Sequence, residues 1–300
     1  MLAKIEGFAA AVLGRLDREA LATLVADLDA VQATVQARED LSAVLTDTSI
    51  AGVTRGQVLS DLLASKVSPP AQRLCTYAAA AAPAPEVPHT LDELAHVART
   101  LLATGRFHHP NRSLLDARRR VSGYADALLD EIDADSFFAI EDDLFRWART
   151  VEATAELRRV LLDRDAPEPS RLGITNELLT GKVHPVALDL ARFVVVGGRP
   201  RDVVGTLDYL VDYVAQTRDW RIARVHSARG LDEDSERELI STLAALTGHS
   251  VDLQVADEPD LLSGVLVEIG DLRLDATTRG RLAALHETLT AGRASGPAAT

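Results

Sequence analysis

The feature that most constrains this chain is an internal repeat without gaps. Residues 5–94 line up with residues 121–210 at a constant spacing of 116 residues, position 121 against position 5. The segment LLASKVSPPA at 62–71 and the segment LLTGKVHPVA at 178–187 share this register. A shared register of this length indicates duplication, so the fold must accommodate two copies of one structural unit. We call residues 5–94 the first repeat and residues 121–210 the second repeat.

Each repeat has the pattern of about six amphipathic helices. Apolar residues recur three and four positions apart, which is the spacing of one helix face. In the second repeat, a helix is predicted from Ser170, whose side chain can cap free N–H groups, to a stop near Gly181. The next begins with Pro185, which suits a first helical turn, and ends on the pair Gly197–Gly198. The repeats are therefore predicted to form two tandem six-helix bundles.

The last third of the chain has a different pattern. Residues 220–228, 250–257 and 264–270 read as strands, the last two by clear alternation of apolar and polar side chains. Residues 231–248 are predicted to form a helix with an acidic first turn, and residues 277–289 a last helix. The fold class is thus predicted as mostly α, with the tandem bundles followed by a small α+β domain.

These patterns divide the chain into four parts. The first bundle is placed at residues 1–106 and the second at residues 107–217. The α+β domain is placed at residues 218–292, and residues 293–300 are predicted to be a disordered tail.

Composition and charge exclude several classes of function. The chain has 300 residues, of which 47% are hydrophobic and only 4% aromatic, so its cores are expected to be aliphatic. The formal net charge is -13. Nucleic-acid binding needs clustered Lys and Arg, and adhesion to an anionic membrane has the same need, so neither partner is expected.

The single cysteine and the lack of a recognisable targeting signal favour an intracellular chain. Cys75 is the single cysteine, so neither an intrachain disulfide nor a cluster of thiolate ligands can form. The N-terminal residues do not resemble a signal peptide, and the longest apolar run, at 77–85, is too short to span a bilayer. We therefore expect a soluble protein.

The stretch LLSGVLVEIGDLRLD at 261–275 is the best candidate for chemistry, and it reads as a hairpin. Gly264 and Gly270 flank a strand, whereas a phosphate cradle needs clustered glycines between a strand and a helix. Asp271 follows Gly270 in a turn, where its side chain can bond its own backbone. Asp275 is better explained by helix capping or by pairing with a nearby arginine than by acid–base catalysis.

The remaining polar residues do not form a recognisable site. His108 and His109 are adjacent, which does not place two metal ligands on one helix face. Cys75 aligns with Ala191 of the second repeat and is expected to be a small core residue, and Trp147 is expected to pack. No cofactor, metal or active site is therefore expected, and the class is a binding or scaffold protein.

The order of the parts and the segment at 257–285 resemble the delta subunit of bacterial F-type ATP synthases, a relative of the mitochondrial oligomycin-sensitivity-conferring protein. The family's helical domain opens with a Tyr-Ala-x-Ala-Leu pattern, which residues 124–128 match. Two departures are mild, with Ser263 in place of glycine and Ala276 in an Asp-Gly-Ser position. The positions that match the family's C-terminal motif are Pro259, Leu261, Leu262, Gly264, Val265, Val267, Ile269, Gly270, Asp271, Leu274, Asp275, Thr277, Arg281 and Leu282.

The resemblance implies a non-catalytic stator subunit with two partners. The family's helical domain binds the N-terminal helix of an alpha subunit between its first and fifth helices, and the C-terminal domain holds the C-terminus of a b-type stalk. Carried over to the second repeat, the alpha groove would use Tyr124, Leu128, Val186, Leu190 and Val194. The stalk contact would use Leu262, Gly264, Leu266, Gly270, Asp275, Leu282, Leu285 and Leu289.

The extra N-terminal bundle resembles extended delta subunits of actinobacteria, in an unfused form because no b-type anchor precedes it. The resemblance places the chain at the cytoplasmic face of the plasma membrane, attached only through the complex. The second repeat is favoured for alpha binding, since it carries Tyr124 and adjoins the stalk-binding domain, but the sequence leaves the choice of repeat open. Two alternatives also stay open, a helical-repeat adaptor unrelated to ATP synthase and an enzyme whose site is assembled from scattered residues.

Overall fold

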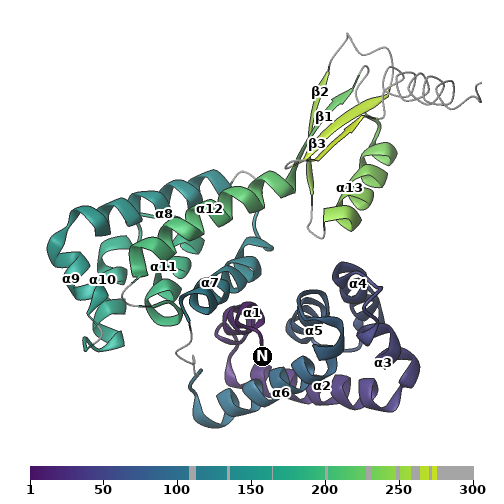
Figure 1. Ribbon diagram of the computed structural model, residues 1–300, viewed down its shortest axis with the longest axis horizontal. Helices are drawn as coiled ribbons and strands as arrows, with labels where there is room; N and C mark the ends of the chain where they lie inside the picture. The colour runs from purple at the N-terminus through teal and green to yellow at the C-terminus, as the bar shows by residue number, and fades with distance from the viewer. Residues whose placement is uncertain are drawn as a thin grey trace, which may run out of the picture. The chain divides into compact units, whose positions relative to one another are not determined.

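The chain divides into two compact units, which are described separately. Unit 1 is Met1–Ala215 and unit 2 is Gln216–Thr300. Figure 1 shows the computed structural model, in which unit 1 is helical and unit 2 carries a sheet. The structure describes residues 1–107, 113–133, 136–163, 165–199, 202–227, 231–247, 251–257, 264–269 and 272–275.

The first repeat contains six α-helices and one short 3-10 helix. Asp17 caps the second of them by accepting a hydrogen bond from the backbone N–H of Ala20 at 2.8 Å. Pro69 starts the fifth, and Gly105, with a φ of +66°, ends the sixth in the left-handed region that favours glycine. The elements are α1 Ala3–Leu13, α2 Arg18–Ala37, α3 Glu39–Thr46, α4 Gly52–Leu63, α5 Pro69–Ala81, η1 Ala84–Glu86 and α6 Val87–Thr104.

The second repeat contains a matching series of six helices. They are α7 Leu114–Leu129, α8 Ser136–Ala153, α9 Ala155–Leu162, α10 Glu168–Leu179, α11 Pro185–Gly197 and α12 Val203–Arg221. Helices α3, α4 and α5 recur with the same lengths, at the spacing of the sequence repeat, as α9, α10 and α11. Helix α10 begins at Glu168, so the prediction that Ser170 caps it is wrong. Pro167 in extended backbone and Pro169 in the first turn set an earlier start.

The two repeats share one hydrophobic core. The buried residues of the first repeat, such as Ile5 and Leu74, belong to the same contiguous cluster as Leu128 and Phe137 of the second. This core is mainly aliphatic, as the composition predicts, and Trp147 is buried in it. Separating the repeats would expose apolar surface that each buries against the other. Whether each repeat forms a bundle of its own, as predicted, is not decided by this shared core and stays a prediction.

Unit 2 contains a four-stranded sheet and one described helix. The strands are β1 Ile222–Ser227, β2 Asp252–Asp257, β3 Val265–Ile269 and β4 Leu272–Asp275, and the helix is α13 Glu233–Thr247. Their order in the sheet is β2-β1-β3-β4. Strands β1 and β2 run parallel, and α13 lies between them in the chain, as a parallel connection requires. Val225, Leu243 and Val267 are at the centre of a small separate core.

The hairpin predicted for residues 261–275 is confirmed in its described part. Strands β3 and β4 pair antiparallel, with Ile269 opposite Leu272, and Gly264 precedes β3 with a φ of +88°. The predicted helix at 277–289 and the predicted tail lie outside the described residues. Among the helices that the structure describes, none has the length and apolar character needed to cross a membrane.

Candidate protein-interaction site

Helices α1 and α7 pack against each other through two glycines. A Cβ atom on Gly7 would lie 1.8 Å from the backbone oxygen of Arg120. A Cβ atom on Gly123 would lie 1.8 Å from the backbone oxygen of Lys4. Only glycine fits at both positions, so the main chains of the two helices touch where they cross. The opening helices of the two repeats are therefore in direct backbone contact.

A buried ion pair joins the same two helices. Glu6 on α1 lies 3.0 Å from Arg120 on α7, and both side chains are about 5% exposed. Arg120 also donates a hydrogen bond of 2.7 Å to the backbone oxygen of Gly197, at the end of α11. Because a buried charge is costly unless it is paired, this contact ties α1 to both α7 and α11.

Asp126 on α7 makes polar contacts with side chains of three other helices. It accepts hydrogen bonds of 2.5 Å from the hydroxyl groups of Tyr77 on α5 and Tyr213 on α12, and it lies 3.1 Å from the ammonium group of Lys4 on α1. Burial raises the pKa of both tyrosines well above their usual value, and the Asp126 charge raises each further. Both hydroxyls therefore stay neutral donors at physiological pH.

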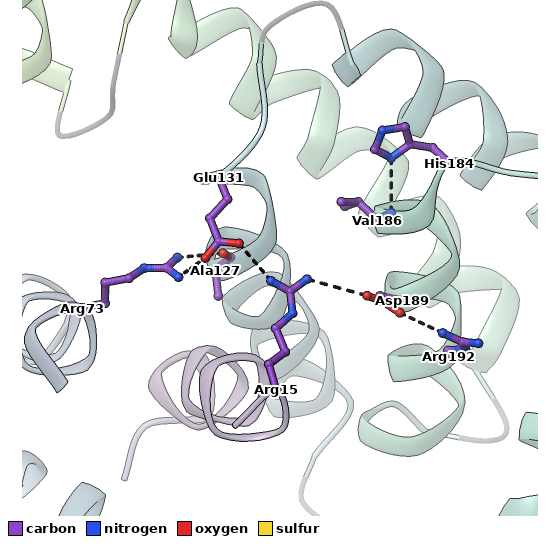
Figure 2. A network of polar contacts seen from close by, with 8 residues as sticks. All are labelled: Arg15, Arg73, Ala127, Glu131, His184, Val186, Asp189 and Arg192. Carbon is purple, nitrogen blue, oxygen red and sulfur yellow. Dashed lines mark hydrogen bonds and ion pairs between the residues drawn. The ribbon is translucent and has the colours of Figure 1, made fainter. Parts of the chain in front are cut away.

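An ionic network lies at the ends of α1 and α7 (Figure 2). Arg15 donates a hydrogen bond of 2.9 Å to Glu131 and lies 3.7 Å from Asp189 on α11. Arg73 on α5 pairs with the same Glu131 and donates 2.9 Å to the backbone oxygen of Ala127. Glu131 thus bridges two arginines of the first repeat, so this end of the contact is held by charges from both repeats.

The five residues predicted to form the alpha groove lie together on α7 and α11, but they are not exposed. Tyr124 stacks on Phe193 with ring centroids 3.8 Å apart. Burial, followed by the nearby Asp189 charge, raises the pKa of Tyr124 to about 12. The other four, Leu128, Val186, Leu190 and Val194, are buried in the core of unit 1.

A small cavity of about 260 Å³ opens beside the helix pair. It is lined by Val12 and Leu16 of the α1 end, Pro69 and Pro70 of α5, and Leu128 of α7, together with the charged groups of the ionic network. Its volume is below the usual range for small-molecule sites. The cavity marks where apolar surface from three helices remains partly open.

Three of the residues predicted for the stalk contact lie in the described part of unit 2. Gly264 precedes β3, Leu266 on β3 is buried, and Asp275 ends β4 directly opposite Leu266. The other five, Leu262, Gly270, Leu282, Leu285 and Leu289, lie outside the described residues.

Within the part of the chain that the structure describes, no group of three or more His, Cys, Asp or Glu side chains is placed to hold a metal ion. Cys75 on α5 is fully buried in the shared core. Burial, with a smaller contribution from the Asp27 charge, raises the pKa of its thiol to about 12. The expectation that Cys75 is a small core residue is confirmed.

The Cys75 thiol is expected to resist alkylation in the folded protein at pH 8. Only a minute fraction is thiolate at that pH, and the side chain has no access to solvent. Labelling with iodoacetamide should be at least about 100-fold slower than in guanidinium chloride. Mass spectrometry of timed samples measures this, and rapid labelling of the native chain would contradict the burial of α5.

Sequence reasoning missed the α1–α7 contact, although a signal for it was present. Gly7 and Gly123 occupy the same position of the two repeats, inside helical patterns, where glycine often marks a close approach of backbones. Glu6 and Arg120 do not stand out in sequence, because a single charged residue on a helix is usually solvated.

Comparison with known proteins assigns one family to the second repeat with unit 2, and also to the chain as a whole. Residues 121–289 match the family described as ATP synthase delta (OSCP) subunit. The ATP synthase subunit delta of Salinispora tropica is 31% identical over 266 residues, covering 89% of this chain and 88% of that protein. That of Rhodococcus opacus is 32% identical over 270 residues, covering 90% and 88%. Coverage this high includes most of the first repeat as well. This chain therefore belongs to the ATP synthase delta (OSCP) subunit family.

Proposed function

We propose that this chain is a peripheral-stalk subunit of an F-type ATP synthase and links the catalytic head to a b-type stalk. Membership of the delta family carries this proposal, because relatives named ATP synthase subunit delta match nearly the whole chain. The family is a structural component of the complex rather than an enzyme. The chain supports proton-driven ATP synthesis by holding the head still while the rotor turns.

The two repeats serve as two copies of the family's helical domain. Their helices recur at the spacing of the sequence repeat, which supports duplication, and each copy contributes six helices. The family match begins at residue 121, which supports the second repeat as the family's usual head-binding domain. The first repeat is then an addition that the relatives of similar length share.

The N-terminal helix of an alpha subunit binds between α7 and α11, at Tyr124, Leu128, Val186, Leu190 and Val194. Helix-in-groove binding needs an apolar strip between two helices, which these residues supply. Four of these residues are buried, Tyr124 is half-buried, and α1 lies against α7, so the incoming helix has to displace or re-seat one of the helices packed there. This requirement predicts slow or weak binding to the free chain.

The C-terminus of a b-type subunit binds unit 2. Exposed apolar side chains on the helix and on two strands of unit 2 support this assignment. They are Ile240 and Leu246 on α13, Val255 on β2 and Leu274 on β4. Such side chains on a small domain suit an amphipathic partner helix. The proposed contact residues remain Leu262, Gly264, Leu266, Gly270, Asp275, Leu282, Leu285 and Leu289. The complex places the chain at the cytoplasmic face of the plasma membrane as a peripheral component.

The test is restoration of coupling to synthase that lacks its delta subunit. Membranes stripped of delta are expected to regain proton-driven ATP synthesis when the full chain is added, because a head without a stator turns with the rotor. Tyr124→Ala should lower the amount of chain retained on the membranes by about tenfold, since it removes a ring from the groove. The matched control is Phe138→Ala on α8, whose ring is 60% exposed.

Retention is measured by quantitative blotting and synthesis by luciferase. Circular dichroism must first show that Tyr124→Ala keeps the parent's helical content. A chain that neither binds the stripped membranes nor restores synthesis would refute the stator assignment. If Phe138→Ala lowers retention on the membranes as much as Tyr124→Ala does, the stator assignment stands but the head contact does not lie in the α7–α11 groove.

A further inference from the structure

Equivalent aromatic pairs occur inside the two repeats. Phe8 stacks on Tyr77 with ring centroids 3.8 Å apart at 10°, and Tyr124 stacks on Phe193 at 3.8 Å and 9°. Tyr124 is the second-repeat counterpart of Phe8, and Phe193 is the counterpart of Tyr77. The first and fifth helices of each repeat are therefore joined by the same ring pair.

The glycine contacts between the repeats also join equivalent positions. Gly7 meets the backbone oxygen of Arg120, and Gly123 meets that of Lys4, where Arg120 is the counterpart of Lys4. Each opening helix thus presents the same surface to the other. A pairing built from equivalent surfaces could also form between two first repeats or two second repeats, so something must select the unlike pair.

The charges at the ends of the helices differ in sign between equivalent positions. Glu131 is the counterpart of Arg15, and Asp189 is the counterpart of Arg73. The observed pairs between the repeats are Arg15 with Glu131 and Asp189, and Arg73 with Glu131 and Asp130. All four positions contribute to the network that Figure 2 shows, and the pairs among these four residues each join one repeat to the other. Within the second repeat, Asp189 also pairs with Arg192 at 3.0 Å.

We propose that the first repeat is the built-in partner of the second, and that the reversed charges at these four positions select the pairing of unlike repeats. If two first repeats paired in the same way, Arg15 and Arg73 would face a second pair of arginines. If two second repeats did so, Glu131 and Asp189 would face two more carboxylates. Like charges in contact oppose pairing, so only the pairing of a first repeat with a second repeat satisfies the network. This selection goes beyond the stalk function and does not depend on it.

Charge reversal in the full-length chain tests this selection. Arg15→Glu with Arg73→Glu makes all four positions acidic, and Glu131→Arg with Asp189→Arg makes them all basic. Each double variant is expected to lower the Tm by roughly 3–10 °C, because at least three attractions become repulsions at a partly exposed site. The variant with all four reversals restores opposite charges among the four positions, while positions 73 and 189 then face the like charges of Asp130 and Arg192. It should therefore regain roughly half or more of the Tm that the less stable double variant loses.

A matched control reverses an exposed pair within α13, Arg237 with Asp234, which lie 2.7 Å apart outside the contact. This reversal should leave the Tm unchanged. The proposal is overturned if the fourfold variant is no more stable than the less stable double variant, or if the control falls as far as the doubles do. If a reversal variant does not fold, glutamine and asparagine replacements at the same positions keep the test valid. The Tm of the fourfold neutral variant must then fall by clearly less than the sum of the falls in Tm of the two neutral double variants.

Discussion

Replacement of Glu6 by alanine is expected to destabilise unit 1 by about 3–5 kcal/mol, because it leaves the buried Arg120 guanidinium without its carboxylate. The two side chains are 3.0 Å apart and about 5% exposed, so water cannot replace the lost partner. Arg120 would keep its hydrogen bond to Gly197, which compensates only part of the charge. Urea unfolding followed by circular dichroism measures the change.

A double variant separates the loss of the pair from the exposure of a lone charge. Glu6→Leu with Arg120→Met replaces both charges with apolar groups of similar size, and it should lie within about 1–2 kcal/mol of the parent. The exposed control Arg237→Ala should change stability by less than about 0.5 kcal/mol. If Glu6→Ala costs no more than this control, the ion pair does not hold α1 in place.

The regular parts of the fold were predictable because they depend on local patterns. The start of α11 at Pro185 and the β3–β4 hairpin follow from spacing and from turn residues within one segment. The start of α10 was missed at Ser170, since two prolines before and after Glu168 outweigh a weak cap signal. Local rules decide such features within a few residues.

The candidate site was only partly predictable, because it depends on how the repeats pair. Tyr124 and Leu190 were identified as a strip shared by the first and fifth helices, and the structure does bring those helices together. How far each is buried could not be read from one repeat, because the two repeats pack into one shared core. The charge reversal between Arg15 and Glu131 was visible in the alignment of the repeats, but its meaning depends on the contact itself.

Replacement of Gly7 by alanine is expected to destabilise unit 1 by about 2–3 kcal/mol, although alanine favours helices. The added methyl group would lie 1.8 Å from a backbone oxygen, which cannot move aside unless α7 shifts. Gly123→Ala should have a similar effect, because its methyl group meets the backbone of Lys4 in the same way. Urea unfolding monitored by circular dichroism measures both.

Gly173→Ala is the matched control, and its expected effect has the opposite sign. Gly173 lies inside α10 with no atom within 4 Å of an added Cβ, so alanine there should stabilise the chain by about 0.5–1 kcal/mol. If Gly7→Ala also stabilises, α1 and α7 are not in backbone contact. If it destabilises as expected, it also loosens α1 from α7, which forms one side of the proposed groove. If an alpha-subunit helix binds beside α7 as proposed, it should bind this variant more tightly than the parent in calorimetric titration, and unchanged affinity would contradict that proposed site.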